Sequence, residues 1–130
     1  AQGSGRIINV CSAAGQYNPP VPADKGGWGF AYGASKAAIA RLAGCINTEY
    51  KTQGVRSFSV NPGVVTTEAV KATLGDDGGL AQRYGAPTPE EIAAALFWLG
   101  TEEDALTLAK SYTMIDLQPL YKERVAAVAE

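Results

Sequence analysis

The sequence predicts an α/β fold built on a parallel sheet, and two features of the chain lead to this prediction. Short runs of apolar and β-branched residues alternate with longer segments of helical periodicity. The 130 residues, 46% of them hydrophobic, are enough for one domain with a single core.

Three short segments are expected to be strands. Residues 6–11 (RIINVC) are apolar and β-branched, which is typical of a strand covered on both faces of a parallel sheet. Residues 55–60 (VRSFSV) form the second strand, which ends at the turn Asn61-Pro62-Gly63. Residues 111–116 (SYTMID) form the third.

A long alanine-rich helix is expected over residues 31–51, with Gly54 just beyond its end as a stop signal. Its larger apolar residues recur at helical spacing along one side: Ile39, Leu42, Ile46 and Tyr50. We expect this stripe to pack against the sheet.

A second helix is expected from Thr88 to about Leu99. Thr88 suits the N-cap, Pro89 the first helical position, and Glu91 the reciprocal position of a capping box. Gly100 is expected to end this helix.

Two shorter helices are expected over residues 68–74 and 120–128. The glycine- and aspartate-rich residues 75–79 lie after the first of these helices and resist regular structure. We therefore expect residues 64–86 to form a mobile lid.

Composition excludes several classes of function. Without histidine there is no Ser–His–Asp triad, no histidine base and no histidine-ligated zinc, and no metal site is expected. The net charge of −2 gives no sign of a nucleic-acid partner, and no apolar stretch is long enough to span a membrane. Cys11 and Cys45 suit a reducing compartment, so we expect a cytoplasmic protein.

The first residues do not resemble the beginning of a complete protein. There is no initial Met and no signal peptide, and a strand follows almost at once. No glycine-rich GxGxxG turn follows any predicted strand, although a doubly wound fold carries that turn in its first half. We therefore expect this chain to hold only the C-terminal half of such a fold.

Tyr32 and Lys36 are four residues apart near the start of the long helix, so their side chains share one face. A nearby cation stabilises a phenolate, which makes a tyrosine usable as a general acid or base near neutral pH. On spacing alone, a surface ring lying over a lysine alkyl chain explains the pair as well.

Ser12 follows directly on the end of the first strand, where open α/β sheets bind their ligands. Its hydroxyl could hold a substrate oxygen while Tyr32 exchanges a proton with it, or it could simply cap a turn. A serine nucleophile is excluded, because the flanking glycines of a nucleophile elbow and an activating histidine are both missing.

Residues 5–15 (GRIINVCSAAG), 32–38 (YGASKAA) and 61–67 (NPGVVTT) together resemble the C-terminal half of a short-chain dehydrogenase/reductase. The resemblance implies a Rossmann-type doubly wound sheet, with residues 1–130 as the C-terminal part of a single domain. It also implies an oxidoreductase that transfers hydride between NAD or NADP and a small carbonyl or alcohol substrate.

By position in this resemblance, Tyr32 matches the catalytic acid/base and Lys36 its cationic partner, which also binds the cofactor ribose. Ser12 matches the residue that hydrogen-bonds the reacting oxygen. The remaining matches are cofactor-binding positions. Pro62 and Gly63 match the turn against the nicotinamide, and Val65 and Thr67 match positions that hold its carboxamide.

The sequence departs from the family pattern in three respects. The glycine-rich turn, the residue that selects NAD or NADP and the family's catalytic asparagine all belong to the N-terminal half, which we expect this chain to lack. Residues 16–30 hold an insertion between Ser12 and Tyr32, and the family's final VDGG-like strand is replaced by residues 114–118, of which only Asp116 matches. An inactive relative that acts as a binding or assembly module remains the alternative. The small residues of the 31–51 helix favour a homo-oligomer paired through that helix.

Overall fold

The computed structural model describes residues 2–74, 85–109 and 114–128. The strands are β1 (Gly5–Val10), β2 (Val55–Asn61) and β3 (Ile115–Asp116). The α-helices are α1 (Phe30–Tyr50), α2 (Glu68–Leu74), α4 (Pro89–Thr101) and α5 (Leu117–Val128). Short 3-10 helices complete the list: η1 (Ala13–Gly15), η2 (Ala23–Lys25), η3 (Lys51–Gln53) and η4 (Asp104–Leu108).

The three described strands form one parallel sheet in the order β1-β2-β3. β1 and β2 pair along their whole length, from Gly5 opposite Val55 to Val10 opposite Val60. β3 pairs only with the end of β2, with Asp116 opposite Asn61. The predicted α/β class with parallel strands is therefore confirmed.

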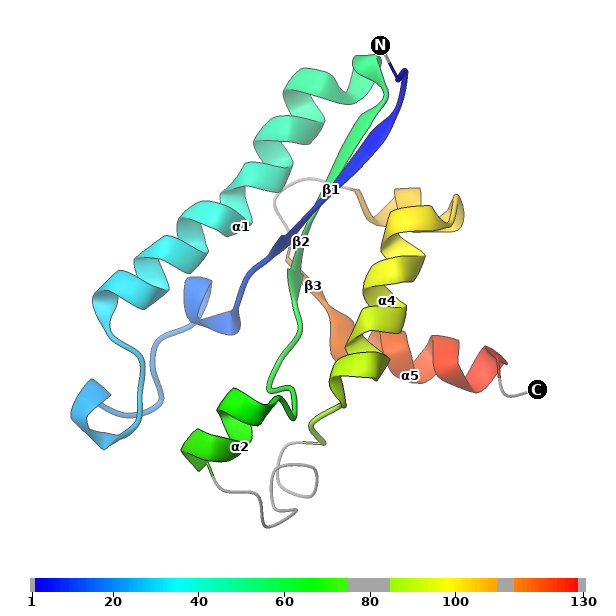
Figure 1. The fold of residues 1–130 in the computed structure, drawn as a ribbon. Helices are drawn as coiled ribbons and strands as arrows, with labels where there is room; N and C mark the ends of the chain where they lie inside the picture. Colours follow the sequence, from blue (N-terminus) through cyan, green and yellow to red (C-terminus); the bar gives the residue numbers. More distant parts are fainter. Residues whose placement is uncertain (1, 75–84, 110–113, 129–130) are drawn as a thin grey trace.

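Helices cover the two faces of this sheet (Figure 1). α1 lies along one face and α4 along the other, and α5 packs beside α4. The main core lies between β2 and α4, and its buried residues are Phe58, Val60, Ile92, Ala95, Leu99, Ala105 and Leu117.

The rotation of α1 about its axis differs from the prediction. Its buried residues are Ala40, Ala43 and Asn47, whereas Ile39 and Leu42 are 38% and 45% exposed. The expectation that the large apolar stripe packs on the sheet is therefore wrong.

The physical reason is that the sheet face beneath α1 is polar. Buried Ser59 donates to the Ala40 carbonyl at 2.8 Å. Asn47 accepts from the Ser57 backbone N–H and donates to the Ser57 carbonyl, both at 2.7 Å. Buried polar groups need such partners, so these bonds turn Asn47 and not the apolar stripe toward the sheet.

β1 is an edge strand in the described part of the sheet. Helices α1 and α4 contact it on opposite faces, but it is not fully buried as predicted. Ile7 and Val10 are 42% and 49% exposed. The apolar composition of residues 6–11 is that of a buried strand, but the described residues supply a paired neighbour on one side only.

The ends of the helices agree with the sequence to within a few residues. The capping box on Thr88 is confirmed, but α4 continues to Thr101, so that Gly100 lies inside it. The helix over residues 68–74 is confirmed, and the last helix starts at Leu117 and not at residue 120.

Parts of two predictions fall outside the described residues. These are the central part of the expected lid, residues 75–84, and the first residues of the third strand, 111–113. In the part of the chain that is described, no helix has the length and apolar character that would let it cross a membrane.

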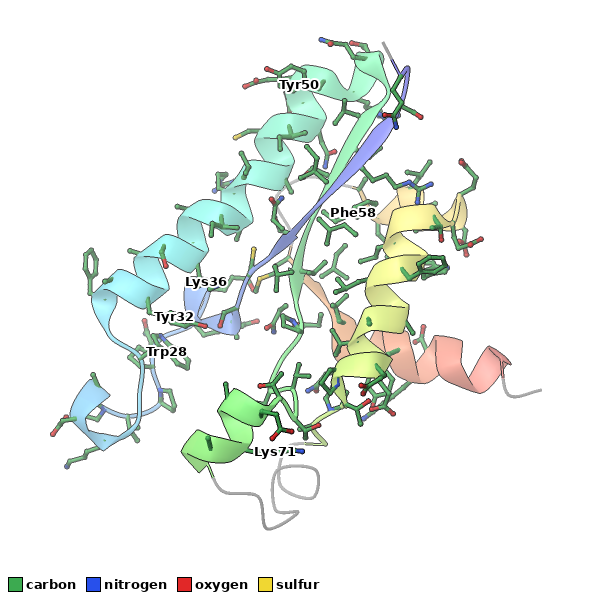
Figure 2. The ribbon with its side chains drawn as sticks, in the orientation of Figure 1. Trp28, Tyr32, Lys36, Tyr50, Phe58 and Lys71 are labelled. Carbon is green, nitrogen blue, oxygen red and sulfur yellow. The ribbon has the colours of Figure 1, made fainter. Side chains whose placement is uncertain are left out.

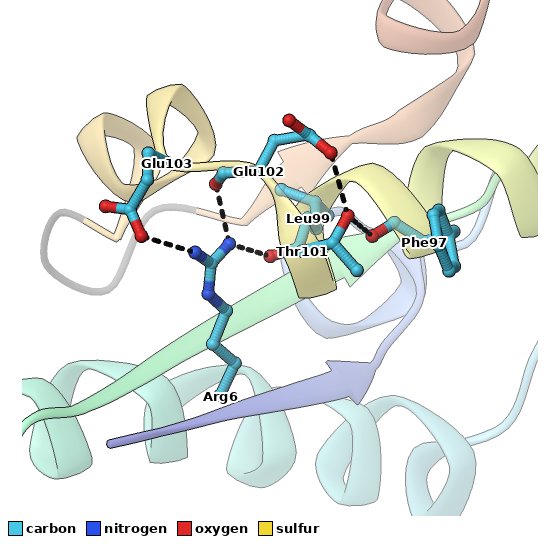
Figure 3. A network of polar contacts seen from close by, with 6 residues as sticks. All are labelled: Arg6, Phe97, Leu99, Thr101, Glu102 and Glu103. Atoms are coloured by element: carbon cyan, nitrogen blue, oxygen red, sulfur yellow. Dashed lines mark hydrogen bonds and ion pairs between the residues drawn. The ribbon is translucent and has the colours of Figure 1, made fainter. Parts of the chain in front are cut away.

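Arg6 on β1 closes the C-terminal end of α4 (Figure 3). Its guanidinium donates to the carbonyls of Leu99 at 2.9 Å and Glu102 at 2.7 Å, and it lies 3.7 Å from the Glu103 carboxylate. The last carbonyls of a helix have no partner within the helix, and a cation is favourable there.

Replacing Arg6 by methionine is expected to lower the free energy of unfolding by about 1–3 kcal/mol, because both carbonyls lose their charged donor. Glu103→Ala should cost less than about 0.5 kcal/mol, since this carboxylate is 90% exposed. Urea unfolding of both variants checks this prediction, and equal losses would show that the surface ion pair and not the carbonyl contacts carries the effect.

Candidate active site

Ser12 lies where β1 ends and η1 begins. Its hydroxyl oxygen accepts from the Ala14 backbone N–H at 3.2 Å, as an N-cap does. The turn-capping role is therefore present, but a hydroxyl that accepts in this way still has its proton to donate.

Gly15 determines how closely η1 approaches α1. A side chain at this position would place a Cβ only 2.8 Å from the backbone N of Ala37 and the carbonyl carbon of Lys36. Glycine therefore allows η1, and the strand end that carries Ser12, to lie directly on the first turns of α1.

Tyr32 and Lys36 lie together on the side of α1 that borders the end of β1 (Figure 2). The Lys36 ammonium group is 5.7 Å from the centroid of the Tyr32 ring and donates to the Val10 carbonyl at 3.4 Å. The Tyr32 side chain is 48% exposed. The cation is thus fixed between a strand end and an accessible phenol.

Trp28 packs against this first part of α1. A Cβ on Gly33 would lie 3.2 Å from the Ala14 carbonyl oxygen and 3.7 Å from the Trp28 ring. A groove of about 410 Å³ runs past this contact, but neither Tyr32 nor Lys36 lines it. We therefore place the candidate site at Ser12, Tyr32 and Lys36 and not in this groove.

The Pro62–Gly63 turn follows β2 at the same edge of the sheet, because β1 and β2 are parallel and in register up to Val10 and Val60. Gly63 has a φ of 71°, a left-handed conformation that favours glycine. The turn therefore lies at the same edge of the sheet as the strand end that leads to Ser12.

The other two predicted cofactor-binding residues are partly engaged within the chain. The Val65 side chain packs against the main core. Thr67 Oγ1 accepts from the Val70 N–H at 3.3 Å at the start of α2, and the Thr67 N–H donates to the Val65 carbonyl at 2.7 Å. Both residues thus also shape the path from the turn into α2.

Asn61 and Asp116 are polar residues at this edge that were not predicted as site residues. Asn61 Nδ2 donates to Asp116 Oδ1 at 2.8 Å, and Asn61 Oδ1 accepts from the Gly63 N–H at 3.1 Å. The sequence signals for the pair are that Asn61 opens the family-like segment 61–67 and that Asp116 is the one residue of segment 114–118 that matches the family pattern.

Burial raises the pKa of the Cys11 thiol above its ordinary value, and the hydrogen bond with Ser59 and the charge of Lys36 offset only part of this rise. Cys45, in contrast, is exposed on α1. Because the thiolate is the reactive form, we expect a water-soluble disulfide reagent to modify Cys45 quickly and Cys11 only on unfolding. Peptide mass analysis checks this, and early modification of Cys11 would contradict its burial.

A parallel sheet with helices on both faces defines an α/β protein, a class in which ligands bind at the carboxyl edge of the sheet. A family model described as short chain dehydrogenase matches residues 1–77, which is more than half of the chain. The chain therefore belongs to the short-chain dehydrogenase family, as the sequence motifs indicated.

Individual relatives agree with this membership. The chain is 32% identical over 120 residues to acetoacetyl-CoA reductase of Cupriavidus necator, covering 87% of this chain and 45% of that protein. Two similar solved structures are 4-hydroxyisoleucine dehydrogenase complexed with NADH (25% identity, TM-score 0.59) and an angucycline C-6 ketoreductase with bound NADP (26%, 0.65). The first alignment covers 87% of this chain and 44% of that structure, and the second 88% and 42%.

This chain thus spans less than half the length of these relatives. The prediction of a partial Rossmann-type sheet is confirmed. Family members of known structure bind NADH or NADP, which agrees with the predicted cofactors.

Proposed function

We propose that this chain carries the catalytic part of an NAD(P)-dependent oxidoreductase that acts on a small carbonyl or alcohol substrate. The observation that carries the proposal is the Lys36 ammonium group, held between the Val10 carbonyl and the ring of the exposed Tyr32. This arrangement places an ammonium group beside a phenol that a substrate can reach, which suits a tyrosine that acts as a general acid/base.

Each site residue has a distinct role in this proposal. The nicotinamide cofactor supplies or accepts the hydride. Tyr32 protonates the substrate oxygen in reduction and removes the proton in oxidation. Ser12 donates a hydrogen bond to the same oxygen, and Lys36 also binds the ribose.

The residues present fit the nicotinamide end of a dinucleotide. An exposed phenol, an ammonium group and the left-handed Pro62–Gly63 turn border the same edge of the sheet. Pro62 and Gly63 would contact the nicotinamide ring, and the backbone around Val65 and Thr67 its carboxamide. The described residues include no glycine-rich turn that could hold the pyrophosphate.

We also propose that residues 1–130 are the C-terminal part of a single domain whose other half binds the rest of the cofactor. The edge of β1 that pairs with no described strand supports this, together with the exposure of Ile7 and Val10 on β1 itself. Additional strands beside β1 would bury these apolar side chains.

The free cysteines support the expected cytoplasmic location.

The experiment that tests the function is a screen of the native protein against aldehydes, ketones and alcohols with both cofactors, preceded by a mass measurement. A mass about twice that of this chain, with oxidation of NADH or NADPH by at least one carbonyl compound, supports the proposal. Cofactor binding without turnover on any substrate class would favour the alternative, a binding or assembly module.

A homo-oligomer paired through α1 is also proposed. Ile39, Leu42 and Tyr50 form an exposed apolar flank on this helix, and such a patch is self-complementary across a two-fold axis. We expect Leu42→Glu to reduce the mass measured by light scattering, whereas Thr52→Glu on η3 should not. A variant that stays oligomeric but unfolds more easily would show that this flank packs within the domain.

A further inference from the structure

Asn61, Asp116 and Gln118 meet at the carboxyl ends of β2 and β3, and we call these three residues the turn clamp. Asn61 and Asp116 are opposite each other in the parallel register and share the 2.8 Å hydrogen bond. Gln118 lies in the first turn of α5, next to Leu117, which is completely buried in the main core. Sheet pairing and core packing therefore bring the three side chains together.

The hydrogen bond to Asp116 decides which way the Asn61 amide faces. An ionised carboxylate only accepts hydrogen bonds, so the Asn61 NH2 group must face Asp116. The amide oxygen then faces the Pro62–Gly63 turn and accepts from the Gly63 N–H at 3.1 Å. Asp116 thus acts on the turn through Asn61.

Gln118 supports the turn from the α5 side. A Cβ on Gly63 would lie 2.6 Å from Gln118 Nε2 and 3.1 Å from its amide carbon, so the glutamine amide lies directly against the glycine backbone. The three clamp residues, together with Gly63 and Pro119, line a cleft of about 290 Å³.

We propose that the turn clamp holds the Pro62–Gly63 backbone in the shape that receives the nicotinamide ring, and that Asn61 and Asp116 are its positioning residues. This inference rests on the proposed function. A turn that is already ordered loses little conformational entropy on binding, so the clamp raises affinity for the nicotinamide end of the cofactor.

Comparing the binding of ADP-ribose with that of the reduced cofactor distinguishes a role in positioning the turn from a role in general folding. ADP-ribose shares the adenosine, pyrophosphate and ribose of NADH but has no nicotinamide, and 2′-phospho-ADP-ribose takes its place where NADPH is the tighter cofactor. A loss of general folding would weaken ADP-ribose and the reduced cofactor alike. A misplaced turn would weaken only the ligand that carries the nicotinamide.

The test uses the native protein, titrated by calorimetry with ADP-ribose and with NADH or NADPH, whichever binds more tightly. N61D places two carboxylates opposite each other, and we expect it to weaken the reduced cofactor about three- to tenfold while ADP-ribose changes less than about twofold. D116N keeps an acceptor for Asn61 and should bind almost normally.

The exchange N61D/D116N restores one donor and one acceptor in reversed places, so we expect it to recover most of the lost affinity. Gln53→Glu on η3, an exposed site at the opposite end of β2, adds a similar charge and should change neither ligand. The melting temperature of every variant is measured in parallel.

Equal losses for both ligands, or no recovery in the exchange variant, would overturn the role of the clamp and leave the proposed function intact. Wild-type protein that binds neither ligand would instead overturn the proposed function, and this inference with it.

Discussion

Replacing Tyr32 by phenylalanine is expected to lower turnover by about 10²–10⁴-fold, the usual cost of removing a general acid or base. The ring remains, so its packing beside the Lys36 ammonium group is kept. Only the hydroxyl that exchanges the proton is lost. Affinity for the reduced cofactor should therefore stay within about twofold of wild type, because the hydroxyl is a small part of the cofactor contact.

Steady-state kinetics and a cofactor titration of the Tyr32→Phe variant check this prediction. Tyr17→Phe is the matched control, because it removes a phenol hydroxyl from a residue that is 67% exposed and lies outside α1. A Tyr32→Phe enzyme that keeps more than about a tenth of the wild-type rate would show that another group transfers the proton.

Lys36→Ala is expected to damage both cofactor affinity and turnover. The substitution removes the cation beside Tyr32 and the donor to the Val10 carbonyl. We expect the rate to fall by about 10²-fold or more, and cofactor affinity by about tenfold with the lost ribose contact. Lys36→Arg keeps a positive charge and should recover part of the rate but less of the affinity, since the two cations differ in shape.

Turnover rates and cofactor affinities of both Lys36 variants, measured side by side, check the prediction that Lys36 serves both catalysis and cofactor binding. Loss of affinity with an unchanged rate at saturating cofactor would mean that Lys36 binds the ribose but does not assist Tyr32. Lys25→Ala on η2 serves as the control, because this lysine lies in an exposed turn.

Local features of the fold could be predicted from the sequence. The start of α4 is an example, because its capping box lies within one helical turn. The Thr88 N–H donates to the Glu91 carboxylate at 2.7 Å, and the Glu91 N–H donates to the Thr88 hydroxyl at 3.3 Å. The rotation of α1 could not be predicted in this way. It depends on Asn47 meeting the backbone of Ser57 on a neighbouring strand, and periodicity alone assumes that the large apolar residues face the sheet.

In the candidate site, too, local neighbours could be predicted from the sequence, whereas contacts between distant segments could not. Tyr32 and Lys36 are one helical turn apart, so their proximity follows from the sequence. The position of η1, which Ser12 caps, depends on the close contact of Gly15 with the backbone of α1, and the Asn61–Asp116 pair joins residues 55 positions apart. Such contacts require the register of the sheet, which the sequence does not give directly.

Transfer of an isotopic label tests the central proposal of hydride transfer most directly. The native protein is supplied with its preferred reduced cofactor, deuterated at the transferring position of the nicotinamide, and with the best carbonyl substrate from the screen. We predict that mass spectrometry finds one deuterium on the carbinol carbon of the product alcohol. A product that forms at the same rate without deuterium at that carbon would contradict the account.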